Sequence, residues 1–307
     1  LQTTMGAVAV TEQAIVNEAH RRGMIVPGRK YRDKDAEPVT AAGAYVATPK
    51  KGIHDWIGSI DINSLYPSAI RAMNMGPETV VGQLRQTMTD HLIKANMVKG
   101  QSFAAAWEGL FASLEYTAVM EQQRGTEITI DWEGGEESVH SAMEIWHMIF
   151  DSNQPWILTA NGTILTYEKK GIIPGLLERW YRERQELQAK KKQTKDPKEI
   201  AFWDKRQLVK KINLNSLYGA ILNPGCRFFD KRIGQSTTLV GRTIAKHMDA
   251  HVNECITGEY DHSGKSIIYG DTDSCYFSAW PMLEKEVKEG RMEWSAETCI
   301  ALYNSIA

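Results

Sequence analysis

Three aspartates lie where strand-like segments end or turn. Asp61 comes at the end of the apolar run WIGSIDI (56–62), and Asp271 and Asp273 lie in the middle of SIIYGDTDSCYF (266–277). Carboxylates on rigid neighbouring strands can hold two Mg²⁺ ions about 3.5–4 Å apart, which activate an attacking 3′-oxygen and hold a triphosphate. Asp is also a common turn residue, so none of these positions indicates a metal site by itself.

The segment Ile62-Asn63-Ser64-Leu65-Tyr66-Pro67 follows Asp61 directly. Backbone N–H groups that leave a strand and enter a helix can cradle an anion, and a cradle beside a metal-binding acid suits a triphosphate. Tyr66 has two interpretations. It is a core aromatic residue, as most tyrosines are, or its ring lies under a sugar and leaves no room for a 2′-hydroxyl.

A second set of candidates follows a predicted helix. Lys211, Asn215 and Tyr218 recur at i, i+4 and i+7, so they share one face. A cation, an amide and an aromatic ring in that order can meet phosphate, sugar and base. The neighbouring Lys210 and Arg206 are either contacts to a DNA backbone or solvated side chains.

These residues belong to a predicted helical hairpin. Pro174 opens the first helix, whose apolar spacing breaks down at KKKQTKDP (190–197). Asp196, Pro197 and Glu199 form a predicted capping box for the second helix, which should run to about Gly219. Arg184 lies 12 residues before Asp196 and Lys211 lies 15 after it. The two cations therefore stand at a similar height and could converge on one anion, although solvent exposure is the default for either.

The remaining segments position these candidates. The caps and spacing predict helices over 11–23, with Thr11 as N-cap and Gly23 as its end, over 103–121, over 136–150 and over 236–257. A short helix should start at Pro67 and stop near Gly76-Pro77. Residues 24–50 should be extended or irregular. Asn161-Gly162 predicts a β-hairpin over 157–167, and 266–277 reads as a second one.

The composition is that of a globular chain of 307 residues, 42% of them hydrophobic. Its net charge of −2 conceals a segment 169–211 with 14 basic and six acidic residues and a segment 101–160 with ten acidic and one basic. One could hold a polyanion that the other repels, or both could be ordinary solvated faces. No apolar run is long enough to span a membrane, and no signal-peptide pattern is present.

Other chemistries lack support in the sequence. The four cysteines are far apart, which favours buried free thiols in a reducing compartment over zinc. The histidines show no H-E-x-x-H spacing, and no Ser or Cys nucleophile signature occurs. The chain begins with Leu rather than Met, so we expect a piece of a longer protein.

Three motifs in order resemble those of the family B DNA polymerases. They are DINSLYPSAI (61–70), KKINLNSLYGA (210–220) and YGDTDS (269–274). The stretches GAYVATPKKG (43–52), MGPETVVG (75–82) and FFDKR (228–232) are similar too, and the likeness looks greatest to the polymerases of T-even-type bacteriophages. The resemblance covers about residues 24–280 and says little about 83–165.

The resemblance implies a role for each matching position. Asp61 and Asp273 would bind the metal ions with the Ile62 backbone, Asp271 would complete the catalytic acids, and Mn²⁺ would substitute for the two Mg²⁺ ions. The family often has a Lys four residues after the arginine that matches Arg184; here that position is Gln188, which puts one phosphate contact in doubt. The remaining assignments are Ser64, Leu65, Tyr66, Arg184, Lys211 and Asn215 for the nucleotide, Tyr218 and Gly219 for the nascent base pair, and Thr272 and Lys210 for DNA.

The resemblance also implies a fold. We expect an α+β protein with a polymerase palm, whose antiparallel sheet carries the acids, and a helical-hairpin fingers module. The expected division is an N-terminal segment (1–50), a first palm part with an insertion (51–166), the fingers (167–222) and a second palm part (223–307). The exonuclease and thumb of the family would be absent.

The expected function is DNA-templated addition of dNTPs to a primer, with primer–template DNA and dNTPs as partners and with no membrane association. The chain would work with the missing exonuclease and thumb regions or with a second polymerase chain, in the cytoplasm (of the host cell, if the source is a phage). One alternative is a non-catalytic, nucleic-acid-binding half of a split or truncated polymerase. Another is a reverse transcriptase or RNA polymerase, which Tyr66 and the motif spellings disfavour.

Overall fold

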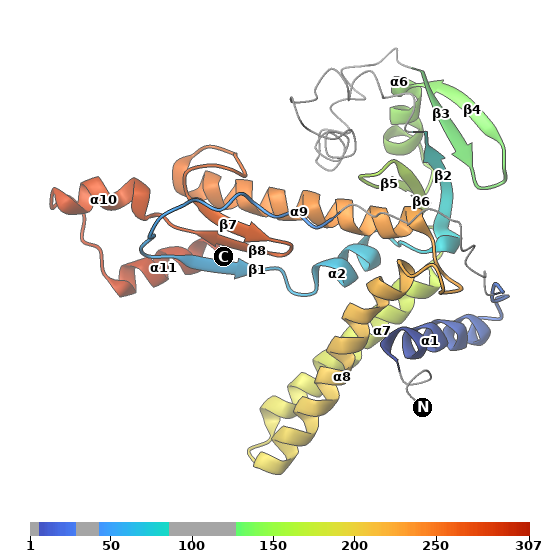
Figure 1. The fold of residues 1–307 in the computed structure, drawn as a ribbon, viewed down its shortest axis with the longest axis horizontal. Coiled ribbons are helices and arrows are strands. Elements are labelled where there is room, and N and C mark those ends of the chain that lie inside the picture. Colours follow the sequence, from blue (N-terminus) through green and yellow to red (C-terminus); the bar gives the residue numbers. More distant parts are fainter. Residues whose placement is uncertain (1–5, 29–42, 86–126) are drawn as a thin grey trace. The chain divides into compact units, whose positions relative to one another are not determined.

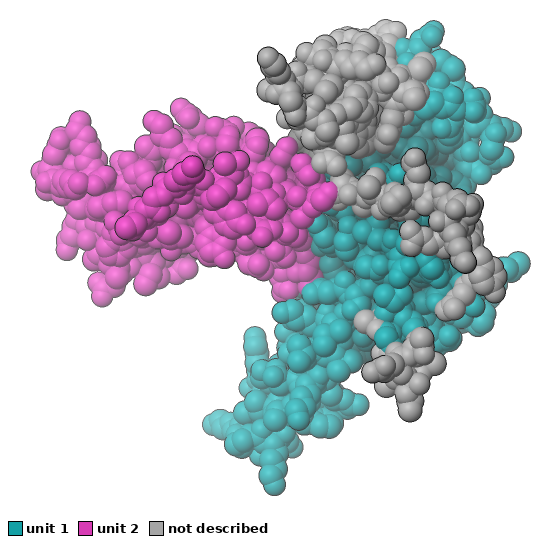
Figure 2. Space-filling model, in the orientation of Figure 1, with its two compact units in different colours: residues 1–42, 66–239 teal, residues 43–65, 240–307 magenta. Residues whose placement is uncertain are grey.

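The computed structural model describes residues 6–28, 43–85 and 127–307 as a mixed helical and antiparallel protein (Figure 1). The chain divides into two compact units (Figure 2). One comprises residues 1–42 and 66–239, and the other comprises residues 43–65 and 240–307. No helix of the described residues is long and apolar enough to cross a membrane.

The first unit contains the larger sheet, with strand order β4-β3-β2-β6-β5 and antiparallel pairing throughout. Its strands are β2 (Val80–Leu84), β3 (Glu127–Trp132), β4 (Glu137–Ser141), β5 (Trp156–Leu158) and β6 (Thr163–Thr166). A short 3₁₀ helix, η1 (Pro77–Thr79), precedes β2, and α6 (Ala142–Trp146) and η3 (His147–Asp151) connect β4 to β5. Buried apolar side chains of β2, β3, β6, α6 and η3 form one core cluster.

The prediction of a helix over 136–150 is wrong for its first residues, because Glu137–Ser141 form a strand. Gly135 takes a left-handed φ of 86°, and its N–H donates to the Trp132 carbonyl at 2.9 Å. This turn pairs Glu137–Ser141 with β3 as strand β4. Helix α6 starts only after Ser141, which forms a capping box with Glu144. The expected hairpin over 157–167 is confirmed as β5 and β6, with Gly162 at φ 79°.

The helical hairpin is confirmed as α7 (Ile172–Gln193) and α8 (Pro197–Ile221), which lie side by side (Figure 1). Asp196 accepts a hydrogen bond from the N–H of Lys198 at 2.9 Å, as a helix cap does. In a capping box, the Glu199 carboxylate would accept a hydrogen bond from the N–H of Asp196. That expectation is wrong, because the Glu199 carboxylate accepts from the hydroxyl of Thr194 at 2.6 Å instead.

Helix α1 (Ala7–Arg21) packs against this hairpin. Thr11 is not its cap as expected: the helix starts four residues earlier and Thr11 is buried within it. Gly23 ends the helix as expected, with φ 68°. Buried Glu18 accepts hydrogen bonds from Arg21, Arg22 and Arg179, and the last of these joins α1 to α7 at 2.8 Å.

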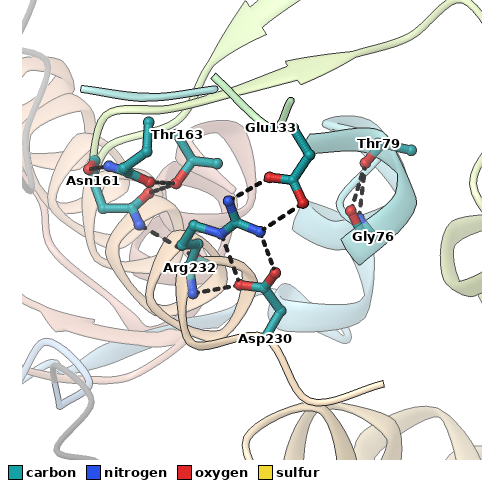
Figure 3. A network of polar contacts seen from close by, with 8 residues as sticks. Gly76, Thr79, Glu133, Asn161, Thr163, Asp230 and Arg232 are labelled. Atoms are coloured by element: carbon teal, nitrogen blue, oxygen red, sulfur yellow. Dashed lines mark hydrogen bonds and ion pairs between the residues drawn. The ribbon is translucent and has the colours of Figure 1, made fainter. Parts of the chain in front are cut away.

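Helix α9 (Lys231–Thr257) begins in the first unit, where polar contacts attach it to the larger sheet. Figure 3 shows Arg232 between Asp230 and Glu133, at 2.7 Å from a carboxylate oxygen of each. Asn161 donates to the Arg232 carbonyl at 3.1 Å. Its amide oxygen accepts from the Ser236 hydroxyl at 2.7 Å.

The second unit contains a three-stranded antiparallel sheet of order β1-β8-β7. Its strands are β1 (Gly58–Asp61), β7 (Ile267–Asp271) and β8 (Ser274–Phe277), and α10 (Trp280–Lys288) and α11 (Ala296–Ile306) follow. Val252 of α9 lies in the core of this unit, and Met248 and Ile256 pack against it. The helix predicted over 236–257 is confirmed, although it starts five residues earlier.

Other expectations are confirmed in part. The short helix α2 (Leu65–Ala72) starts two residues before Pro67. Within 24–50, the described residues form no helix and a single bridge, between Val46 and Asp271. The cysteines are free, but Cys255 is exposed rather than buried. The expected helix over 103–121 lies outside the described residues.

Candidate active site

The tip of the β7–β8 hairpin is held by backbone hydrogen bonds. Thr272 adopts a left-handed φ of 58°, which is uncommon for a residue with a Cβ. Its N–H donates to the Tyr45 carbonyl at 2.8 Å, and the N–H of Asp273 donates to the Asp271 carbonyl at 2.6 Å. The N–H of Ile62 donates to the Asp273 carbonyl at 2.7 Å and so connects the end of β1 to the tip.

This arrangement brings the three acids to one edge of the small sheet. Asp61 and Asp271 both pair with Ser274 of the central strand, one from each side. Partial burial raises the pKa of the Asp273 carboxyl, and the negative charges of Asp61 and Asp271 raise it further. The sheet register, which puts Asp61 and Asp271 on either side of Ser274, accounts for this mutual repulsion.

The three carboxylates differ in their partners. Asp271 accepts hydrogen bonds from the Thr272 hydroxyl at 2.8 Å and the Tyr269 hydroxyl at 3.3 Å. Within the described ranges, no side chain donates a hydrogen bond to Asp61 or Asp273. The carboxylates of Asp61 and Asp273 thus keep their acceptor sites for a ligand, whereas Asp271 uses two of its sites within the hairpin.

The donor set fits Mg²⁺ that is only partly coordinated by protein. No group of three His, Cys, Asp or Glu side chains in the described residues could hold a metal ion by itself. Mg²⁺ prefers oxygen ligands, and it usually keeps several waters and binds one or two carboxylates together with substrate phosphates. Asp61, Asp273 and the backbone of Ile62 offer oxygens of this kind.

The turn after Asp61 contains a residue with a left-handed backbone conformation. Ser64 has a left-handed φ of 59°, and its hydroxyl donates to the Asn63 side chain at 3.2 Å. Leu65 is buried and begins α2. A left-handed non-glycine residue stores backbone strain, which often marks a binding site.

Tyr66 and Tyr218 form an aromatic pair in the first unit. Their ring centroids are 4.6 Å apart, with an angle of 50° between the ring planes. The Tyr218 hydroxyl is hydrogen-bonded to the Thr238 hydroxyl, and burial raises the pKa of Tyr218. Both interpretations of Tyr66 remain open, because a core aromatic and a sugar-contacting ring can each make this pair.

The predicted cations of the hairpin lie at a similar height, as expected. Glu183 on α7 pairs with Lys210 on α8, and Arg184 donates from Nε to Gln207 Oε1 at 3.3 Å. This register puts Lys211 within about one helical turn of the level of Arg184. Arg184 is 8% exposed, whereas Lys211 is exposed.

The other predicted positions of α8 face open space or a mixed-charge cleft. Asn215 is exposed, and a Cβ on Gly219 would meet no atom within 4 Å. Lys210 and Arg206 line a cavity of about 400 Å³ together with Glu183 and Glu186. Their role at a DNA backbone stays a prediction, because these acids share the cleft.

The candidate residues are brought together as two sets. The acids and Ser64 lie in the second unit, and Tyr66, Arg184, Lys211, Asn215, Tyr218 and Gly219 lie in the first. Sequence reasoning missed Gln207, which contacts Arg184, and Asp249, which is buried against Gly270 of the β7–β8 hairpin, called the acid hairpin below. The sequence feature that could have identified Asp249 is its charge, which interrupts the apolar face of α9.

Comparison with known proteins agrees with the motifs. Residues 3–289 match the family model described as DNA polymerase family B. The DNA-directed DNA polymerase of Escherichia phage RB69 is 25% identical over an alignment 304 residues long, which covers 93% of this chain and 31% of that protein. A DNA polymerase of Trichoplusia ni ascovirus 2c is 26% identical over an alignment 286 residues long, which covers 76% of this chain and 27% of the viral protein.

The fold has a counterpart among solved structures. The family B DNA polymerase of Pyrobaculum calidifontis superposes with a TM-score of 0.52 at 20% identity, covering 92% of this chain and 28% of that one. The chain thus spans under a third of the length of these relatives. Because the family model matches most of this chain, the chain belongs to DNA polymerase family B.

Proposed function

We propose that this chain is the palm-and-fingers core of a DNA-directed DNA polymerase, which adds dNTPs to a primer 3′ end. The observation that carries this proposal is the convergence of Asp61, Asp271 and Asp273 on one edge of the small sheet. Family membership supports it. In this proposal the small sheet is part of the palm, and α7 and α8 are the fingers.

Asp61, Asp273 and the Ile62 backbone would hold two divalent ions. Such ions supply an activated 3′-oxygen and charge neutralisation at the triphosphate. Asp271, kept in place by Thr272 and Tyr269, adds negative charge beside them. The left-handed turn at Ser64 directs backbone N–H groups toward phosphate oxygens.

The fingers residues act by position and charge. Arg184 and Lys211 neutralise the triphosphate and stabilise the charge that develops on the transferring phosphoryl group. Asn215 and the open backbone at Gly219 leave room for the incoming nucleotide, and Tyr218 lines the nascent pair. Tyr66 lies under the deoxyribose and excludes a 2′-hydroxyl.

The test is single-nucleotide primer extension with Mg²⁺, a primer–template duplex and dNTPs. We expect extension by the parent chain, and loss of at least 100-fold with Asp61→Asn and with Asp273→Asn. Asp55→Asn is the matched control, because Asp55 is an exposed aspartate of the same unit outside the acid hairpin. It should extend like the parent.

The contrary result separates the two candidate functions. Binding of primer–template DNA with no extension, unchanged by Asp61→Asn or Asp273→Asn, would replace this proposal with a nucleic-acid-binding role that needs another chain for catalysis.

A further inference from the structure

A chain of polar contacts crosses the helical hairpin and ends at Arg184. Lys191 Nζ on α7 lies 2.6 Å from Asp204 Oδ1 on α8. Gln207 Nε2, one turn further along α8, donates to the same oxygen at 3.1 Å. Gln207 Oε1 accepts from Arg184 Nε at 3.3 Å, back on α7.

The order of these contacts fixes the orientation of the Gln207 amide. The Lys191 hydrogen bond lowers the pKa of Asp204, and the Gln207 bond lowers it further, so Asp204 is an ionised acceptor. An ionised carboxylate cannot donate, and therefore the NH₂ group of Gln207 faces it. The carbonyl end of the same amide then has to face Arg184, which can only donate.

The contact to Gln207 uses only the inner nitrogen of Arg184. Among the described residues, the two terminal nitrogens of Arg184 make no hydrogen bond, and neither is sealed from solvent. A guanidinium held at Nε keeps its planar pair of terminal donors for a bidentate contact with a phosphate. The rest of the side chain is buried, so the guanidinium has little freedom to turn elsewhere.

A contribution to folding stability is a poor explanation for the contact between Lys191 and Asp204. The side chains of Lys191 and Asp204 are 38% and 46% exposed. Exposed ion pairs contribute between about 0 and 1 kcal/mol to folding, because water and salt screen them. Their consequence is the orientation that they impose on Gln207.

We propose that Gln207, oriented by Asp204 and Lys191, is a positioning residue that aims the guanidinium of Arg184 at a triphosphate. The inference rests on the proposed function for the identity of the anion. It assigns no proton transfer to Gln207, which touches Arg184 rather than the substrate.

The test measures the affinity of the chain for inorganic tripolyphosphate with Mg²⁺ by isothermal titration calorimetry. We expect Gln207→Leu to weaken binding about 2- to 10-fold, as the loss of one hydrogen bond to a positioned group does. In an Arg184→Ala background the same substitution should change binding less than about 1.5-fold, because its effect passes through Arg184. Gln185→Leu, the same change at an exposed position of α7, should bind like the parent.

Melting temperatures are recorded for every variant, so that unfolding is not mistaken for lost affinity.

Three results would overturn the inference: parent-like binding by Gln207→Leu, an undiminished effect in the Arg184→Ala background, or no tripolyphosphate binding by the parent. Primer extension is recorded in parallel. Absent extension with the expected binding pattern would overturn the proposed function and leave the role of Gln207 standing.

Discussion

The replacement Asp249→Asn should stabilise the protein at neutral pH. Asp249 is 1% exposed, and neither carboxylate oxygen completes a hydrogen bond of normal geometry within the described residues, although the Tyr45 hydroxyl and the Cys275 thiol lie nearby. Burial raises the pKa of Asp249 from 3.8 to about 6. At about 1.36 kcal/mol per pKa unit, ionisation costs the folded state about 3 kcal/mol.

The sign follows from which state binds the proton more tightly. Well below pH 3.8 the carboxyl is protonated in both states and costs nothing. As pH rises from about 4 to about 6, the unfolded chain ionises freely and the folded chain resists, so the stability of the parent falls. Asparagine resembles the protonated acid and avoids this loss. The gain should therefore grow from about 0.5 kcal/mol at pH 4 to about 3 kcal/mol at pH 8.

Urea unfolding followed by tryptophan fluorescence, at steps from pH 4 to pH 8, measures this difference. Asp261→Asn is the matched control with the opposite sign, because the N–H and hydroxyl of Ser263 lower the pKa of the exposed Asp261 carboxyl. It should give no gain at pH 8. A gain for Asp249→Asn that does not change with pH, or a loss at pH 8, would refute the reasoning.

Three further predictions use other parts of the molecule. Tyr66→Ala should raise incorporation of rNTPs relative to dNTPs at least tenfold if the ring excludes a 2′-hydroxyl; an unchanged ratio in primer extension would assign Tyr66 to the core. Glu18→Gln should cost about 1–3 kcal/mol at pH 7 in urea unfolding, and less as the pH falls toward 2. Burial alone would raise the pKa of Glu18, but hydrogen bonds from Arg21 and Arg22 and the charge of Arg179 lower it to about 2. Solvent screens the partly exposed arginines, which limits the size of the cost. Asn161→Ala should cost about 1–3 kcal/mol, because it removes the acceptor shared by the buried Thr159 and Ser236 hydroxyls and the donor to the Arg232 carbonyl; no change in melting temperature would contradict this.

The sequence predicted those elements whose signals are local. Asp followed by Pro is enriched at helix starts, and α8 begins at Pro197 with Asp196 as its cap. Gly162 and the alternation around it likewise predicted β5 and β6. In contrast, β4 was read as part of a helix, because pairing with β3 decides the conformation of that segment and depends on a turn at Gly135.

The site divides in the same way. The acids could be named from sequence because their chemistry is tied to residue type and to a hairpin that is visible in the alternation. Gln207 could not, since its partner Arg184 lies 23 residues away and the contact depends on the register of two helices. Height along a helix can be counted from a cap, but which side chains meet across the hairpin depends on rotation about each axis as well.

The acid hairpin also shows why substitutions there should report on chemistry rather than on folding. Three carboxylates that converge repel one another, and this repulsion contributes to the raised pKa of Asp273. Their placement is maintained by N–H groups of Ile62, Thr272 and Asp273, which donate to backbone carbonyls and not to the carboxylates. Replacing Asp61 or Asp273 by asparagine keeps these bonds and removes one of the repelling charges. The variants should fold at least as well as the parent, so any loss of primer extension can be assigned to the missing carboxylate.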